Sequence, residues 1–133
     1  MTTELYWLTL TILMTALFWI PYVLDRPFVR GFKPFLLEAH PETGTRHSEW
    51  AQRAMRAHHN AVENLVIFAP AIGIAHALNI SSPATRAAAI VYFFARLAHY
   101  VVYTAGIPLT RTLAFTIGWA AQMAIIASIL RWI

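Results

Sequence analysis

Long apolar segments alternate with short polar ones along this 133-residue chain. The stretch 5–24 contains no charged residue, and neither does the stretch 112–130. Two further, predominantly apolar stretches, 65–78 and 87–106, lie between them. A helix needs about 20 apolar residues to cross the hydrocarbon core of a bilayer. The pattern therefore predicts four membrane-spanning helices.

The fold class predicted from this pattern is an all-α integral membrane protein. We expect a bundle of four transmembrane helices with both termini on the same side. A single domain should cover residues 1–133, with helices at about 2–24, 48–78, 83–105 and 109–132 and a loop at 25–47. Ser48 is a good N-cap for the second helix, and Ser82-Pro83 is a typical start for the third.

A polar stripe runs along the first half of the second predicted helix. Its members recur at steps of three and four and therefore share one helix face: Arg53, Arg56, Asn60, Glu63 and Asn64. Ionisable groups at a bilayer edge usually face a bundle interior, a partner or a wet cavity. Either Arg53 or Arg56 neutralises Glu63 within the protein, or the excess of guanidinium groups holds an anionic ligand.

The third predicted helix carries a second stripe, formed by Arg96, His99 and Tyr103. Arg96 either pairs with Glu63 or contacts a ligand, whereas packing alone would explain His99. Arg111, which opens the fourth helix, is either a positive-inside anchor or a cation that stabilises a ligand anion such as a thiolate. No metal site is predicted, because no full ligand set with metal-like spacing is present.

Charge and composition narrow the function classes. The formal net charge of +4 arises from basic residues at helix ends and in short loops, which indicates membrane topology rather than nucleic-acid binding. The positive-inside rule puts the first and third loops in the cytosol, and we expect a multi-pass protein of a bacterial inner membrane. The chain has no cysteine, so any thiol chemistry must use a thiol that arrives with a ligand.

Two segments resemble motifs of a known family. RAMRAHHNAVEN in the second helix, and FARLAHYVVY in the third followed by a short loop and an arginine, are similar to the MAPEG proteins, membrane-associated proteins in eicosanoid and glutathione metabolism. The resemblance covers nearly the whole chain. It implies a homotrimer of four-helix protomers with ligand sites at subunit boundaries. It also implies that glutathione is conjugated to lipophilic electrophiles or used to reduce lipid hydroperoxides.

The resemblance, together with the two stripes, assigns roles to individual residues. Arg111 matches the arginine that activates the thiol, and either Arg26 or Arg30 matches a basic residue near the end of the first helix. The remaining glutathione contacts would be Arg53, Arg56, His58, Asn60, Glu63, Asn64, Arg96, His99 and Tyr103. The chain departs from some members in having His99 where they have tyrosine, and in one extra residue between Tyr103 and Arg111.

Three hypotheses follow. The first is a membrane glutathione transferase, because a site with several arginines and one glutamate matches the two carboxylates and one ammonium of glutathione. The second is a non-catalytic membrane protein of the same family that binds lipid or glutathione. The third is a small multidrug transporter, which is disfavoured because such transporters carry their essential glutamate in the first helix, and 5–24 is uncharged here.

Overall fold

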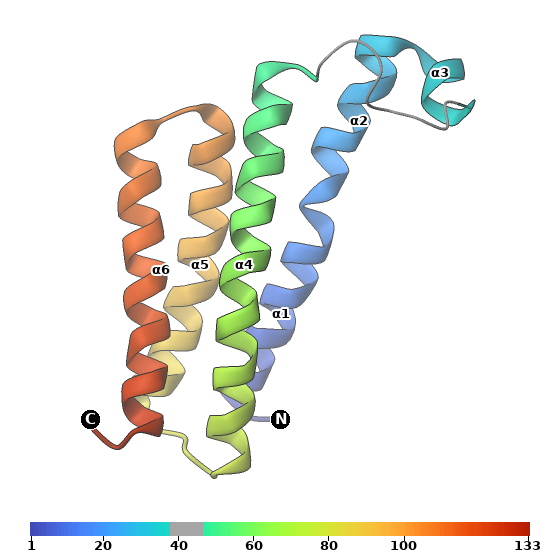
Figure 1. Cartoon of the computed structure of the whole chain (residues 1–133). Helices are drawn as coiled ribbons and strands as arrows, with labels where there is room; N and C mark the ends of the chain where they lie inside the picture. Colours follow the sequence, from blue (N-terminus) through green and yellow to red (C-terminus); the bar gives the residue numbers. More distant parts are fainter. Residues whose placement is uncertain (38–46) are drawn as a thin grey trace.

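The computed structural model describes residues 1–37 and 47–133, apart from the side chains of Arg30, Pro34 and Phe35. Every regular element in that part of the chain is a helix: α1 (Thr3–Leu17), α2 (Trp19–Arg30), α3 (Phe32–Leu37), α4 (Glu49–Ala77), α5 (Pro83–Ala105) and α6 (Pro108–Ile129). Four helical stretches are long and apolar enough to cross a membrane: Thr3–Val29, Glu49–Ala77, Pro83–Ala105 and Pro108–Ile129. The predicted fold class is confirmed, with both termini at the same end of the bundle (Figure 1).

The four long helical stretches lie roughly side by side (Figure 1). Helix α5 packs against α6, α4 and α1, while α4 also contacts α1, α2 and α6. Helices α1 and α2 follow one another as a nearly continuous rod along α4, and α3 projects from the far end of that rod. Helices α4 and α5, which carry the two polar stripes, therefore pack directly against one another.

The first helical segment extends further than the sequence indicates. A helix at 2–24 and a loop at 25–47 were expected, but α2 continues to Arg30 and α3 follows at once. Pro21 has no N–H for the Leu17 carbonyl, so its effect is a break at Phe18 rather than the end of the helix. Helix α2 runs on through Pro27 and ends at Gly31, which has φ +84°. Residues 38–46 of the expected loop lie outside the described residues.

The two predicted helix starts differ in detail. Ser82 and Thr85 form a full capping box at the start of α5, with Pro83 at the first helical position. Ser48 occupies the N-cap position of α4 without capping it through its side chain. Its hydroxyl instead donates to Asp25 Oδ1 across 2.6 Å, and its N–H donates to Oδ2 across 2.9 Å. Ser48 therefore joins the start of α4 to the middle of α2.

Three helices end in the same way, and this ending pairs a carbonyl group of the last turn that would otherwise lack a hydrogen-bond partner. In each, a residue with positive φ follows the helix, and the next N–H reaches back to a carbonyl five residues earlier. The positive-φ residues are Asn79, Gly106 and Arg131, and the bonds are Ile80 N to Ala75 O (2.8 Å), Ile107 N to Val102 O (3.0 Å) and Trp132 N to Ala127 O (2.9 Å). These tight ends make possible the short connections on either side of α5.

Two stacked aromatic pairs hold α5 in the bundle. The rings of Phe68 and Tyr92 stack at 3.7 Å, and those of Phe18 and Tyr100 stack at 3.8 Å. The Tyr100 hydroxyl also donates to the Phe18 carbonyl across 2.9 Å, which anchors the α1–α2 break on α5. Small side chains on α4 let the helices approach closely; Ala51, Ala54, Ala57 and Ala61 are all buried.

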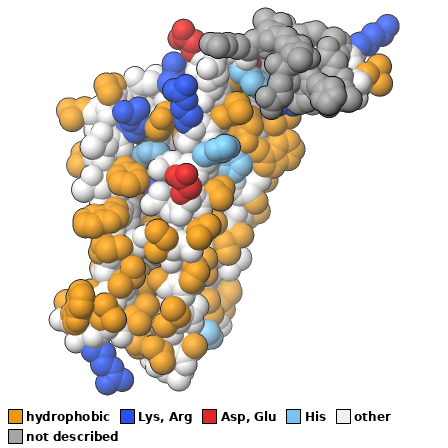
Figure 2. Space-filling view, in the orientation of Figure 1, with side chains coloured by type: hydrophobic (Ala, Val, Ile, Leu, Met, Phe, Trp, Pro, Cys, Tyr) orange, Lys and Arg blue, Asp and Glu red, His pale blue; other side chains and the backbone are white. Residues whose placement is uncertain are grey.

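Hydrophobic side chains are also spread over the outer surface in view. Figure 2 shows them over the middle of the bundle, with Lys, Arg, Asp, Glu and His gathered mainly toward the end where α4 begins. Large exposed hydrophobics such as Leu13, Val66, Phe94 and Leu113 are typical of side chains that face lipid or another transmembrane subunit.

Candidate functional site

A buried arginine lies at the centre of the candidate site. Arg96 of α5 is only 2% exposed, and its Nη2 donates to the Asn60 side-chain oxygen on α4 across 2.6 Å. Gly118 of α6 leaves space for it, because a Cβ there would lie 3.3 Å from Arg96 Cδ. Among the described residues, Nε and Nη1 of Arg96 have no hydrogen-bond partner. The guanidinium therefore has buried donors that no group among the described residues uses.

Further polar groups surround Arg96 inside the bundle. The ring of His99 lies 5.5 Å from that of Tyr103 and 6.2 Å from that of Phe115, over which Arg96 Cζ lies at 5.9 Å. Within the described part of the chain, buried polar atoms of this region that lack a partner include His99 Nδ1, Tyr92 Oη and Gln122 Oε1. Buried polar groups normally find a protein or water partner, so this region has unused capacity for hydrogen bonding.

Arg111 lies at the end of the same stripe that is predicted to face the cytosol. Its Cζ is 4.7 Å from the centre of the Tyr103 ring, a distance at which cation and ring attract one another. The side chain is only half-buried. The structure thus brings three of the predicted residues of α5 and α6 into one row, Arg96, Tyr103 and Arg111, with His99 between the first two.

The residues of the stripe on α4 lie in two different environments. Asn60 faces Arg96, while Arg56, His59 and Glu63 are exposed. Glu63 and His59 line an open pocket of about 310 Å³ together with Tyr22, His58 and Val62. The Tyr22 hydroxyl and His58 Nδ1 are hydrogen-bonded at 2.9 Å, which fixes His58 against α2.

Arg53 and Asn64 make contacts of a different kind. Arg53 Nε donates to the Thr104 carbonyl across 2.9 Å, at the C-terminal end of α5, and its Nη1 lies 3.9 Å from Glu49. A Cβ on Gly106 would approach Arg53 Cζ to 3.3 Å. Asn64 Nδ2 donates to the Asn60 carbonyl one turn earlier in its own helix. In the single chain, Arg53 therefore joins α4 to the end of α5, whereas Asn64 supports its own helix.

These positions can be compared with known proteins. The model of the MAPEG family matches residues 3–131. The chain belongs to the MAPEG family. No match was found among curated proteins or among solved structures. MAPEG proteins generally bind glutathione and act with lipid partners, and four spans make this member a multi-pass integral membrane protein.

Within the described residues of one chain, Glu63 forms none of the ion pairs with Arg53, Arg56 or Arg96 that the sequence left open. Within residues 1–37 and 47–133, Glu63 lies in no salt bridge, Arg53 pairs with Glu49, and Arg96 bonds to Asn60 rather than to a carboxylate. No group of three or more metal-ligating side chains occurs in the same residues. The side chain of Arg30, one of two candidates on the first helix, lies outside the described residues.

Three contacts of the site were not predicted from the sequence. Tyr22 bonds to His58, Gly118 makes room for Arg96, and Arg26 donates from Nε to His47 Nε2 across 3.2 Å. The last contact sets Arg26 at the junction of α2 and α4. No local sequence pattern predicts these contacts, because each joins residues more than twenty positions apart. The glycine in the apolar run of α6 was the one available signal, since glycine within a transmembrane helix often marks close packing.

Proposed function

We propose that this MAPEG protein is a membrane glutathione transferase that conjugates glutathione to lipophilic electrophiles. The observation that carries the proposal is the row of Arg96, Tyr103 and Arg111, with Asn60 beside it. Two donors of a fully buried guanidinium have no partner among the described residues, and buried cations in membrane helices rarely lack a role.

The charge pattern of these groups suits glutathione. The tripeptide carries two carboxylates, one ammonium and a thiol at neutral pH. Arg56 and Arg96 would bind its carboxylates through charge-assisted hydrogen bonds, and Glu63 would bind its ammonium. His58, Asn60, Asn64, His99 and Tyr103 would orient the peptide frame, with Arg53 and Arg30 at the rim. No metal is needed for this arrangement.

A homotrimer with sites at its subunit boundaries is part of the proposal. In one chain, Arg56 and Glu63 are exposed on α4, whereas Arg96 and Arg111 lie along α5 and α6. An exposed stripe of charges at membrane depth is costly unless a partner or ligand covers it. A neighbouring copy would supply that cover. Native mass spectrometry should give a particle of about three times the 15.0 kDa chain mass.

Arg111 would act on the thiol. A free thiol has a pKa of about 8.5, and a nearby cation lowers that value, so the bound thiol loses its proton to water more readily. The thiolate then attacks the electrophilic carbon of an aryl halide. A carbon–sulfur bond forms, the carbon–halogen bond breaks, and halide leaves with the bonding electron pair. Reduction of lipid hydroperoxides by the same thiolate would be a companion activity.

The position of the polar groups suits two routes of entry. Glutathione would arrive from the cytosol, at the end where α4 begins and where Figure 2 shows most of the charged side chains. The acceptor would enter from the lipid between hydrophobic side chains. The positive-inside rule puts the first and third loops on the cytosolic side of the membrane. The membrane would be a bacterial inner membrane.

Calorimetry with glutathione, followed by an assay with a lipophilic aryl halide, tests the proposal in native-like lipid. We expect saturable binding and turnover that depends on glutathione. The double variant Arg56→Met/Glu63→Leu should lose binding, while Glu49→Gln, whose side chain is 93% exposed, should behave like the wild type. Absence of both binding and turnover in the wild type would overturn the proposal.

A non-catalytic member that binds glutathione or lipid is the second candidate. The contact of Arg111 with the Tyr103 ring favours it, because a guanidinium held on a ring is less free to approach a thiol. This candidate predicts glutathione binding without turnover, and no change of affinity in Arg111→Ala. Membership of the MAPEG family argues against a small multidrug transporter.

A further inference from the structure

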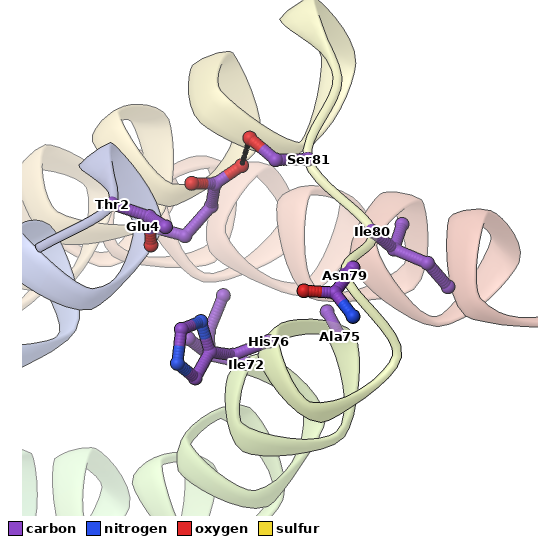
Figure 3. A pocket seen from close by; sticks show the side chains of 8 residues that line it. All are labelled: Thr2, Glu4, Ile72, Ala75, His76, Asn79, Ile80 and Ser81. Carbon is purple, nitrogen blue, oxygen red and sulfur yellow. Dashed lines mark hydrogen bonds between the residues drawn. The ribbon is translucent and has the colours of Figure 1, made fainter.

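A second pocket lies at the other end of the bundle, near the start of α1 and the turn between α4 and α5. Its volume is about 140 Å³, and its polar lining comes from Thr2, Glu4, His76, Asn79 and Ser81. Figure 3 shows Thr2 and Glu4 on one side of it and His76 and Asn79 on the other. The pocket shares no residue with the candidate glutathione site, so an inference from it does not depend on the proposed function.

Glu4 is the unusual member of this pocket. The side chain is 4% exposed, and its Oε1 accepts hydrogen bonds from Ser81 Oγ (2.9 Å) and Thr85 Oγ1 (2.7 Å). Its Oε2 is buried and has no hydrogen-bond partner among the described residues. Those residues also place no Lys, Arg or His within salt-bridge distance of Glu4. A buried carboxyl group with an unused oxygen is costly unless something pairs with it.

The helix ends at this pocket act in opposite ways. The start of α1, with Glu4 in its first turn, and the start of α5, with Thr85 bonded to Glu4 Oε1, are positive dipole ends that stabilise the carboxylate. The end of α4, which carries His76 and is followed by Asn79, is a negative end and favours a cation. The unused oxygen and the end of α4 therefore attract the same kind of ligand, a positively charged group.

We propose that this pocket binds a primary ammonium group. Such a group has three N–H donors, and the pocket offers the exposed Asn79 side-chain amide and His76 imidazole as acceptors. The buried Glu4 carboxylate behind them supplies the negative charge that attracts a cation. A water molecule occupies about 30 Å³ in the liquid, so 140 Å³ holds an ammonium head together with a few water molecules. A divalent metal suits the pocket less well, because the described residues include no group of three metal-ligating side chains.

Two sources can supply this chemistry. The pocket lies at the end of membrane-spanning helices, where lipid headgroups are found, so the ammonium of phosphatidylethanolamine is one source. A small soluble amine is the other. Phosphatidylcholine is the matched negative probe, because its quaternary ammonium carries no N–H donor and is larger.

Native mass spectrometry of the full chain released from mixed vesicles tests the lipid source. We expect phosphatidylethanolamine adducts to exceed phosphatidylcholine adducts about tenfold at equal lipid concentrations, as one charge-assisted hydrogen bond would produce. Glu4→Gln keeps an acceptor for Ser81 and Thr85 but loses the charge, so the preference should disappear. Glu49→Gln makes the same change on an exposed side chain and should keep it.

Thermal unfolding in detergent tests the soluble source and covers the case in which Glu4→Gln does not fold. Methylammonium chloride should raise the unfolding midpoint of the wild type above that in tetramethylammonium chloride at equal ionic strength. Asn79→Gly preserves the positive φ of residue 79 and removes one acceptor, so it should reduce the difference.

The two measurements together decide the matter. A preference for phosphatidylethanolamine alone identifies the lipid as the source, and a response to methylammonium alone identifies a soluble amine. If the wild type has neither preference, or if the Glu4 and Asn79 variants both keep it in full, the proposal is wrong.

Discussion

Arg96 Nη2 on α5 donates to the side-chain oxygen of Asn60 on α4 across 2.6 Å, and this bond joins the two polar stripes of the protein. Both residues lie where the helices pack, and Arg96 is almost completely buried. The same bond therefore stabilises the bundle and orients a guanidinium that the proposed function requires. Stability and ligand binding should be coupled at these two positions.

A double-mutant cycle should reveal this coupling. Asn60→Leu leaves the buried Arg96 charge without its partner, so we expect a loss of about 3 kcal/mol in the free energy of unfolding. Arg96→Leu removes the charge itself but strands the Asn60 amide. The double variant Asn60→Leu/Arg96→Leu should be more stable than Asn60→Leu alone. Unfolding in a denaturing detergent series gives all four values.

The double-mutant cycle has a matched control variant and one result that would contradict it. Asn64→Leu removes a hydrogen bond within a single helix, so it should cost only about 1 kcal/mol. If the effects of Asn60→Leu and Arg96→Leu simply add, the two side chains do not interact energetically, and the bond has no role in holding α5 to α4.

Alanine should be destabilising at Gly118 and stabilising at Gly73. A Cβ on Gly118 would lie 3.3 Å from Arg96 Cδ and 3.5 Å from Ala95 Cβ, so Gly118→Ala should destabilise the protein by about 1–3 kcal/mol. A Cβ on Gly73 would meet nothing within 4 Å. Gly73→Ala should therefore stabilise helix α4 by about 0.5–1 kcal/mol. Equal unfolding midpoints for the two variants would contradict this reading of α6 packing.

Asp25 should be needed to hold α2 against the start of α4. Its carboxylate accepts from Ser48 N and Ser48 Oγ, and it lies 3.2 Å from His47 Nδ1. Asp25→Ala removes all three contacts from a buried position, so we expect a loss of about 2 kcal/mol and faster proteolysis between α2 and α4. Glu49→Ala, at an exposed position, should cost less than about 1 kcal/mol. Identical cleavage rates for Asp25→Ala and the wild type would refute this role.

The membrane spans were predictable because their signal is local. Lengths of uncharged sequence fix the number of helices, and Ser82-Pro83 fixes the start of α5 through a capping box within four residues. The limits of the first helix were not predictable in the same way. Pro21 and Pro27 suggest an end to the helix, but packing of α2 against α4 keeps it helical as far as Arg30.

The sequence predicts which residues of the candidate site share a helix face, but not which of them contact one another between helices. Steps of three and four put Arg96, His99 and Tyr103 on one side of α5 whatever surrounds that helix. Periodicity within one helix does not say which residues of a neighbouring helix its polar stripe contacts. It left open whether Arg96 meets Glu63, and the structure pairs it with Asn60 instead. Tyr22 was missed for the same reason, because its partner His58 lies 36 positions away.

Arg111 provides the sharpest test of the proposed chemistry. If its cation stabilises the thiolate of bound glutathione, Arg111→Ala should lower turnover about 100-fold with little change in glutathione affinity. The thiol pKa in the complex should rise toward about 8.5, so the pH–rate profile should shift to higher pH and the loss should shrink under alkaline conditions. Arg86→Ala changes an exposed arginine at the opposite end of the bundle and should leave both quantities unaltered. A uniform loss of rate at every pH would show instead that Arg111 acts through its packing on Tyr103.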